Sequence, residues 1–581
     1  MRIDEIVARA ASAVVVMLAF LGCQESTVQR GSQPPPAAAS LTRQQVSDLT
    51  LLGLVWGFTK YHHSAVTSGA VDWDEALLEV MGEVLDSSEA ATQVIDRWLA
   101  KLGEPPECVI CAELPEDVHL LVELDWLDAE VLRAAGLDER LRRIYANRPT
   151  GRRQHYVEHT VGVGRPVFRN EKEYSTTPLP SRNHRILALY RFWNVIQYWY
   201  PYRDLISDWQ DVLTAFIPRV WDTTTPAEYR LAMQAFAASI GDGHTGIFGV
   251  PSVRPPFGTS RLPVSLRFLG GRAVVTGYTD QRLGGATGLE VGDIIQALGG
   301  RPIDSLVMEV APYYGASNDG ARLLYIARSL TRGPPGPVIV TGMREDSVFT
   351  TLANRTAIRR QGIWRAPRIS ADAFRIIGDD VAYLVLASAR ASESASYVEK
   401  ASRSGIFVID LRSYPREFFV PSLVQHFVKQ PTAIASITRA DAMNPGVFFW
   451  GSPVVVTPAG PTYEGTVVIL VNEATQSQGE YTAMAFRAAP NAFVAGSRTA
   501  GADGDVSTVV LPGGLRTLIS GVGIFWPDRT PTQRVGILPD IPAFPTAEGI
   551  RQNRDEVLEA AVSKVLGRRF LLPRPEGSSP R

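Results

Sequence analysis

Ser477 lies in a stretch of sequence that suits a nucleophile. It follows the apolar run VVILV (467–471) and a polar loop, and it precedes QGEYTAM (478–484), which has helical spacing. Ser477-x-x-Glu480 is typical of a capping box, in which both side chains bind free N–H groups at a helix start. A helix start beyond the carboxyl end of a buried strand also favours catalysis, because its N–H groups can hold a developing oxyanion. Both roles are open for Ser477.

A nucleophilic serine needs a general base, and His244 is the histidine whose local sequence fits best. It lies in GDGHTG (241–246), where glycines let the backbone bring the ring close to a partner. A loop histidine without a chemical role is the alternative. No G-x-S-x-G elbow surrounds Ser477, so an α/β-hydrolase is not supported.

Four near-continuous apolar runs predict the strands that would position these residues: 381–387, 405–411, 466–472 and 492–496. Strands buried on both faces have this pattern, and the helical stretches between them predict a layered α/β core. Upstream, short alternating strands and Gly-rich turns, including GLEVGDII (288–295), predict a small β-rich domain.

Two earlier segments, beginning at Leu51 and Leu189, resemble each other. Each predicts a helix, an aromatic-rich turn and a second helix, and the aligned pairs are Trp56 with Trp193, Tyr61 with Tyr198, and Asp72-Trp73 with Asp208-Trp209. The helical spacing of their aromatic residues predicts core packing rather than a cofactor site.

Charge and targeting signals limit the class of protein. Lys plus Arg (58) nearly balances Asp plus Glu (60) without a basic run, which excludes a nucleic-acid-binding surface. The apolar run at 10–21 is too short to span a bilayer and predicts a secretory signal. Cys23 directly follows it, as in the lipobox of bacterial lipoproteins, so we expect an exported cell-envelope protein, periplasmic or anchored to the outer membrane by lipid on Cys23.

Cys108 and Cys111 form a lone C-x-x-C, which could be redox-active or half of a zinc site, but no second ligand pair follows at zinc-finger spacing. A local disulfide is the favoured interpretation. The expected organisation is a signal peptide (1–23), a flexible linker (24–45), an N-terminal helical module (46–150), a helical module carrying the His244 loop (183–255), the β domain (262–354), the α/β core (371–567) and a tail (568–581).

Seven motifs occur in an order that resembles one family. They are WNVIQYWYPY (193–202), GDGHT (241–245), GLEVGD (288–293), DLRSYP (410–415), VNEATQSQGE (471–480), GSRTAGADG (496–504) and GILPD (536–540). Together they resemble the serine peptidases that comprise the C-terminal processing (tail-specific) proteases and the tricorn core protease, over roughly residues 185–565.

The resemblance implies a crotonase-like (ClpP/crotonase) α/β core with an inserted PDZ-like domain. Ser477 matches the nucleophile and the Gln478 N–H matches one oxyanion donor. The second donor belongs to the loop near Pro415, and because proline has no N–H we expect Arg416 to supply it. The chain has Arg416-Glu417 where the family usually has a glycine pair.

The resemblance also implies the base. Processing proteases use a lysine after the nucleophile, but the chain reads TAGADG (499–504) there, so the tricorn-like histidine, here His244, is expected instead. The serine that orients the tricorn histidine falls at Gly243, and Gln533 is the nearest position to the glutamate behind it. Asp242, Thr245 and Glu480 are the other residues that could orient the ring.

These expectations lead to three hypotheses about function. The first is an exported serine endopeptidase of peptides or unfolded proteins, with no cofactor and no metal. The second is a catalytically inactive binding protein on the same fold, and the third is an interaction scaffold that uses the PDZ-like and helical modules.

Overall fold

The fold is taken from a computed structural model, which describes residues 40–108, 111, 113–151, 154–248, 254–358 and 372–573. Cys23 and most of the expected linker therefore lie outside the described residues. The first helix, α1 (Arg43–His62), begins within the expected linker. Thr42 and Gln45 form a capping box at its start, with the Gln45 N–H donating to Thr42 Oγ1 at 3.2 Å and the Thr42 N–H to Gln45 Oε1 at 3.0 Å.

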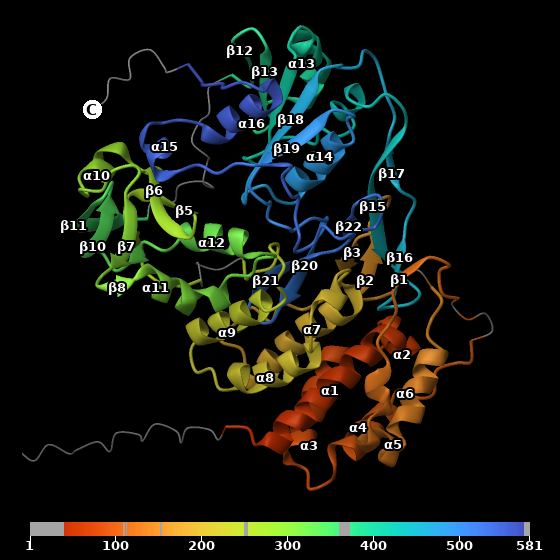
Figure 1. Cartoon of the computed structure of the whole chain (residues 1–581). Helices are drawn as coiled ribbons and strands as arrows, with labels where there is room; N and C mark the ends of the chain where they lie inside the picture. The colour runs from red at the N-terminus through yellow and green to blue at the C-terminus, as the bar shows by residue number, and fades with distance from the viewer. Residues whose placement is uncertain are drawn as a thin grey trace, which may run out of the picture. The chain divides into compact units, whose positions relative to one another are not determined.

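The α/β core is built on a six-stranded sheet of order β12-β13-β14-β18-β19-β23 (Figure 1). Its strands are β12 (Phe374–Ile377), β13 (Val381–Val385), β14 (Ile406–Asp410), β18 (Thr466–Val471), β19 (Ala492–Gly496) and β23 (Ile541–Pro542). The four strands predicted from apolar runs are confirmed and pair in parallel, while β12 is an antiparallel edge strand.

Both faces of this sheet are covered, which explains the continuous apolar runs. Alternate residues such as Ile409 and Ile469 pack with α13 (Ser394–Ala401) and α14 (Gln478–Arg487). The intervening residues, such as Val408 and Val468, pack with α16 (Glu556–Leu566). The carboxyl end of β18 leads into the start of α14, so the layers place Ser477 at that edge of the sheet.

A second sheet extends the core. It contains β1 (Val118–Leu120), β16 (Phe448–Trp450), β15 (Thr432–Ala440) and β17 (Val454–Val456), and β22 (Gly523–Phe525) also pairs with β15. Beside it, β20 (Val506–Leu511) and β21 (Leu515–Ser520) form a hairpin. The segment from 150 to 182, expected to be irregular, contains a short hairpin of β2 (Val157–His159) and β3 (Pro166–Phe168).

The predicted β-rich domain is an eight-stranded antiparallel sheet with helices. Its strands are β4 (Ser260–Arg261), β5 (Val264–Leu269), β6 (Arg272–Tyr278), β7 (Ile294–Leu298), β8 (Arg301–Pro302), β9 (Arg332–Gly333), β10 (Gly336–Arg344) and β11 (Ser347–Ala357). Its helices are α10 (Gln281–Gly285), α11 (Ile303–Val310) and α12 (Asp319–Ala327).

The two related helical hairpins share a reciprocal hydrogen-bond pair. In the first hairpin, the indole N–H of Trp56 in α1 donates to the Trp73 carbonyl at 3.1 Å. The indole N–H of Trp73, which begins α3 (Trp73–Asp86), donates to the Trp56 carbonyl at 2.9 Å. In the second, Trp193 of α7 (Arg182–Trp199) and Trp209 of α8 (Trp209–Trp221) do the same at 2.8 and 3.2 Å. The aligned tryptophans therefore occupy equivalent positions, and they are core residues as predicted.

The hairpins also share a buried charge network. Lys60 contacts Glu171 at 2.7 Å, and Arg191 contacts both Glu171 at 2.8 Å and Asp74 at 2.6 Å. Two cations and two carboxylates balance one another, so burial leaves no net charge. The other helices of this region are α2 (Ser64–Thr67), α4 (Ala91–Ala100), α5 (Glu130–Ala135), α6 (Leu137–Ala146) and α9 (Pro226–Ala238).

Candidate active site

Ser477 occupies the N-cap of α14 in a strained backbone conformation. Its φ of 54° and ψ of −125° lie outside the regions that a side-chain-bearing residue ordinarily adopts. An ordinary capping serine has extended backbone angles instead. Such strain persists only where surrounding contacts enforce it, and it is common at active sites. Ser477 thus lies on a strained turn between strand and helix, although no G-x-S-x-G motif surrounds it.

Glu480 supplies the contacts that enforce this turn. Its buried carboxylate accepts hydrogen bonds from the Gly501 N–H at 2.8 Å, the Ala502 N–H at 2.9 Å, the Ser477 N–H at 3.3 Å and the Thr499 hydroxyl. Burial raises the pKa of Glu480, and these donors partly offset that effect. The carboxylate therefore holds the 499–502 loop against the nucleophile turn. The possibility that Glu480 orients His244 is wrong, because its acceptor capacity is used here.

His244 is oriented by Asp242 and Ser520. The ring Nδ1 lies 3.0 Å from Ser520 Oγ and 3.2 Å from Asp242 Oδ1, and the Ser520 hydroxyl donates to Asp242 Oδ2 at 2.7 Å. Because the carboxylate only accepts and the hydroxyl hydrogen is committed to it, both partners accept from Nδ1. The neutral ring therefore carries its proton on Nδ1 and leaves Nε2 as a proton acceptor. Among the described residues, buried Nε2 has no hydrogen-bond partner.

Asp242 is fully buried, yet it remains ionised. Burial favours its neutral form, but hydrogen bonds and charge from His244, together with the Ser520 hydroxyl, more than compensate and lower the pKa of Asp242 to about 2. The His244 N–H also donates to Asp242 Oδ1 at 2.8 Å. A buried carboxylate of this kind holds an imidazole in one orientation and stabilises its protonated form.

The histidine loop and the nucleophile turn lie against each other. A Cβ on Gly243 would be 3.4 Å from Gln476 Nε2 and 3.0 Å from Ala502 Cβ. The Ser477 N–H donates to the Ala502 carbonyl at 2.8 Å, so Ala502 contacts both segments. No hydrogen bond joins His244 Nε2 to Ser477 in this structure. Catalytic hydrogen bonds are often long without substrate and shorten in the reacting complex.

The two expected oxyanion donors differ in availability. Gln478 is the first residue of α14, where the backbone N–H has no acceptor within the helix. The Arg416 N–H instead donates to the Leu386 carbonyl at 3.2 Å. The expectation that Arg416 supplies the second donor is therefore wrong in this conformation, because its N–H is already bonded. The Gln478 side chain donates to the Glu417 carbonyl at 2.6 Å and so joins this loop to α14.

Gln533 and Thr245 do not contact the imidazole. The Gln533 amide donates to Ser317 Oγ at 3.3 Å and to Tyr200 Oη at 3.5 Å, and Ser317 Oγ accepts from the Gly243 N–H at 2.9 Å. Gln533 therefore supports the backbone before His244, not its ring. The Thr245 hydroxyl donates to the Asp242 carbonyl at 2.8 Å.

Sequence reasoning missed three supporting residues. Ser520 ends β21, 276 residues from His244, and no motif marks it. Tyr202 donates to the Asp503 carbonyl at 3.2 Å and accepts from the Ile524 N–H at 2.7 Å, which explains part of the aromatic motif at 193–202. Tyr325 of α12 donates to Gln476 Oε1 at 2.5 Å, so the β domain contacts the residue before the nucleophile.

Asp503 is a second buried carboxyl beside the site. Its pKa is raised well above the ordinary value by burial and by the charge of Glu480, with partial compensation from the Gly504 N–H. That N–H donates to Asp503 Oδ1 at 2.8 Å, and Oδ2 has no partner among the described residues. The surroundings of Asp503 therefore favour its neutral form, whereas those of Asp242 favour its charged form.

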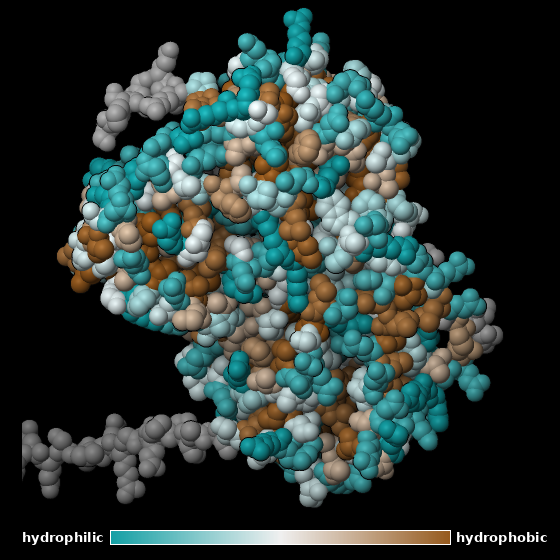
Figure 2. Space-filling view, in the orientation of Figure 1, coloured by the Kyte–Doolittle hydropathy of each residue, from teal (hydrophilic) through white to brown (hydrophobic). Residues whose placement is uncertain are grey.

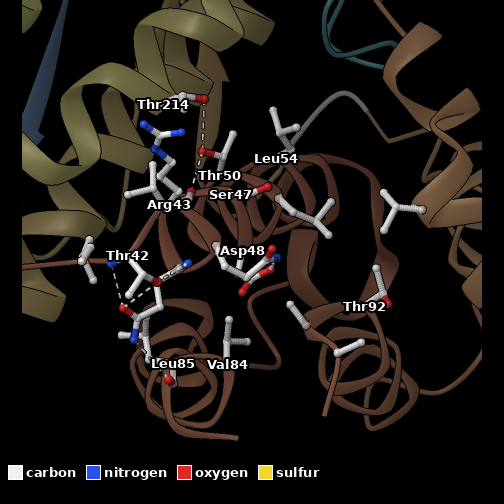
Figure 3. Close-up of a pocket in the computed structure, with 18 of the residues that line it drawn as sticks. Thr42, Arg43, Ser47, Asp48, Thr50, Leu54, Val84, Leu85, Thr92 and Thr214 are labelled. Atoms are coloured by element: carbon white, nitrogen blue, oxygen red, sulfur yellow. Dashed lines mark hydrogen bonds between the residues drawn. The ribbon is translucent and has the colours of Figure 1, made fainter. Parts of the chain in front are cut away.

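A wide groove lies away from the candidate catalytic residues. This groove of about 1350 Å³ runs between α1, α3, α4 and α8, and Figure 3 shows the side chains of Thr42, Asp48, Val84 and Thr214 around it. Its lining contains none of the candidate catalytic residues.

Within the described ranges, no cluster of His, Cys, Asp or Glu could hold a metal ion, and no helix is long and apolar enough to cross a membrane. Cys108 and Cys111 are joined as a disulfide with Cα atoms 5.3 Å apart.

An apolar strip is exposed on the β domain. Ile339, Val348 and Leu352 have exposed fractions of 51%, 70% and 63%, and Ile339 pairs directly with Leu352 across β10 and β11. Figure 2 shows apolar atoms at the surface in this region, at the left of the view. The strip lies on a different element from the catalytic residues.

Comparisons with known proteins identify the class. Residues 380–543 match the model of peptidase family S41. The structure of mature CPAF complexed with lactacystin is similar with a TM-score of 0.51 and 14% identity, covering 66% of this chain and 97% of that one. The crystal structure of mature CPAF gives a TM-score of 0.50 and 14% identity, covering 66% of this chain and 96% of that one. No curated protein sequence matches the chain.

The family match and the fold indicate a peptidase, a hydrolase of the serine type. The region that matches peptidase family S41, residues 380–543, contains Ser477 and Glu480. The photosystem II D1 C-terminal processing protease is also similar, at 17% identity with a TM-score of 0.37, covering 61% of this chain and 92% of that one.

Proposed function

We propose that the protein is an exported serine endopeptidase that cleaves peptides or unfolded proteins, with Ser477 as nucleophile and His244 as base. The observation that carries this proposal is the acceptor Nε2 of His244, which is held by Asp242 and Ser520 beside the strained turn of Ser477. A buried acceptor nitrogen without a protein partner is costly unless a reacting group uses it.

In the proposed mechanism, His244 Nε2 takes the proton of the Ser477 hydroxyl as Oγ attacks the peptide carbonyl. Asp242 stabilises the imidazolium that forms, and the Gln478 N–H stabilises the oxyanion. The imidazolium then protonates the leaving amine, so the peptide C–N bond breaks and an acyl-enzyme remains. Water, deprotonated by His244, releases the acyl group and restores Ser477.

The proposal includes a crotonase-like core and a PDZ-like domain. The parallel sheet with helices on both faces supports a crotonase-like core, and the antiparallel sheet of 260–357 supports a PDZ-like domain. Such a domain would add a substrate segment as an extra strand. The signal sequence and Cys23 support export and lipid anchoring in a bacterial envelope.

Proteolysis of a denatured protein tests the proposal. We expect wild-type protein to cleave reduced, carboxymethylated casein, and Ser477→Ala and His244→Ala each to reduce cleavage by about 1000-fold or more, as removal of a member of a catalytic triad does. His184→Ala is the matched control, because His184 contacts Ser181 at the start of α7 and lies outside the site. Undiminished cleavage by Ser477→Ala would refute the mechanism.

A catalytically inactive binding protein is the second candidate. The observation in its favour is the Arg416 N–H, which bonds to Leu386 and leaves one oxyanion donor. Wild-type protein that binds denatured casein but never cleaves it, with binding unchanged in Ser477→Ala, would support that candidate instead. Capture by peptides with free but not amidated C-termini would support a scaffold role for the PDZ-like domain.

A further inference from the structure

A second recess lies against the histidine loop, and its chemistry is cationic. It has a volume of about 500 Å³, and its lining includes Arg322 of α12, Arg498 and Arg534. Among the described residues that line it, Asp319 is the only acidic one. Three guanidinium groups and one carboxylate leave a net positive charge in a concave site.

Two of these arginines are not neutralised. Arg534 donates to the Leu205 carbonyl and, at 2.8 Å, to the Ile240 carbonyl, while Arg498 donates to the Val535 carbonyl at 2.5 Å and to the Arg534 carbonyl. Carbonyl oxygens fix the orientation of a guanidinium without cancelling its charge. Within the described part of the chain, neither side chain forms an ion pair. Arg322 pairs at 2.8 Å only with Asp319, whose side chain is 89% exposed.

Backbone donors add to the recess. α12 begins at Asp319, and Asn318 Oδ1 caps it by accepting from the Ala321 N–H at 3.0 Å. The N–H groups of Asp319 and Gly320 precede that bond and have no acceptor within the helix. The positive end of a helix thus lies among the arginines, and both features favour an anion.

The recess is connected directly to the catalytic residues. Its wall includes Gly241, three residues before His244, and Ser317, which accepts the Gly243 N–H at 2.9 Å. Asn318 donates to the Thr499 carbonyl at 2.8 Å, next to the loop that Glu480 holds. Since an extended chain spans at most about 3.5 Å per residue, Gly241 lies within about 11 Å of His244.

We propose that this recess is a substrate subsite that binds a carboxylate carried by the peptide near the cleaved bond. This inference rests on the proposed peptidase function. The positive charges of Arg322, Arg498 and Arg534, and the guanidinium N–H groups that the backbone carbonyls do not use, suit a carboxylate, whereas a neutral amide gains no charge-assisted bonds there. The carboxylate belongs either to an acidic side chain or to the C-terminus of the substrate.

Internally quenched peptides test the subsite. Glu or Gln is placed at each of the positions flanking the cleavage site, and every peptide is made with a free and an amidated C-terminus. We expect one Glu position, or the free C-terminus, to raise kcat/KM roughly tenfold over its neutral partner, mainly through KM. Arg322→Gln should abolish that preference without reducing cleavage of the Gln, amidated peptide.

Arg301→Gln is the matched control, because Arg301 is an exposed arginine of the same domain whose ion pair with Glu309 lies outside the recess. Arg498→Lys is a second test: it keeps the charge but loses the fork, so the preference should shrink. Equal kcat/KM for all acidic and neutral pairs, or a preference that survives in Arg322→Gln, would overturn the subsite.

Binding to Ser477→Ala separates this inference from the proposed function. Fluorescence anisotropy with labelled Glu and Gln peptides reports the recess without turnover. Tighter binding of the Glu peptide that depends on Arg322, together with no cleavage of any peptide by the wild-type protein, would retain the subsite and reject the peptidase. Cleavage without any carboxylate preference would do the reverse.

Discussion

Replacing Asp242 by Asn isolates the contribution of the residue that orients His244. The pKa of Asp242 is lowered from its ordinary 3.8 to about 2, which corresponds to about 2 kcal/mol in favour of the charged carboxylate. The introduced amide would keep the shape of the side chain but lose this charge, and its NH₂ group would face the Ser520 hydroxyl or His244 Nδ1.

A hydrogen bond to a charged group contributes about 2 kcal/mol, so loss of the one between the carboxylate and the imidazolium lowers kcat/KM about 30-fold. A reversed tautomer, with the proton moved to Nε2, would lower it further, because the base would then lack its acceptor. Initial rates on denatured casein at pH 8 provide the measurement, and circular dichroism checks that the variant is folded.

Asp441→Asn is the matched control. Asp441 is also a buried carboxylate, accepting from Asn444 Nδ2 at 2.7 Å and the Met443 N–H at 2.9 Å, but it lies outside the site. A folded Asp242→Asn protein with kcat/KM within threefold of wild type would refute the orienting role.

Further expectations concern the supporting residues. Ser520→Ala removes one acceptor of the Nδ1 proton and should lower kcat/KM about fivefold, measured with the same substrate; an unchanged rate would exclude Ser520 from the site. Asp503 has a raised pKa, so its contribution to stability is present below pH 4 and is lost as pH rises. Asp503→Asn should therefore raise the melting temperature relative to wild type at pH 8 and lose that advantage near pH 4; a lower melting temperature at both pH values would contradict this. Trp73→Phe and Trp209→Phe each remove one indole hydrogen bond and should cost about 1 kcal/mol in thermal unfolding, whereas we expect reduced proteolysis only for Trp209→Phe. We expect the second hairpin to support the site because its Tyr202 donates to the Asp503 carbonyl. Equal losses of activity in Trp73→Phe and Trp209→Phe would contradict this.

The strands of the core were predictable because burial on both faces requires apolar residues at every position. The same physical rule explains why Ile409 and Val408 face different helices although the sequence does not distinguish them. The hairpin repeat was also predictable, since its aligned tryptophans repeat both residue type and spacing.

The site was predictable only in part. Ser477 and His244 lie in marked motifs, but the partners of His244 depend on contacts between distant segments. Ser520 approaches the ring through the β20–β21 hairpin, and the choice of Asp242 over Gln533 or Glu480 depends on loop conformation. Arg416 was inferred by excluding Pro415, and the Leu386 carbonyl that accepts its N–H could not be anticipated from local sequence.

Labelling with a serine-directed fluorophosphonate tests the central claim most directly. Folded wild-type protein is treated with the probe, digested, and mapped by mass spectrometry. We predict one modified residue, Ser477, with no labelling in Ser477→Ala and much slower labelling in His244→Ala. Modification at another serine, or at Ser477 with a rate independent of His244, would contradict the account.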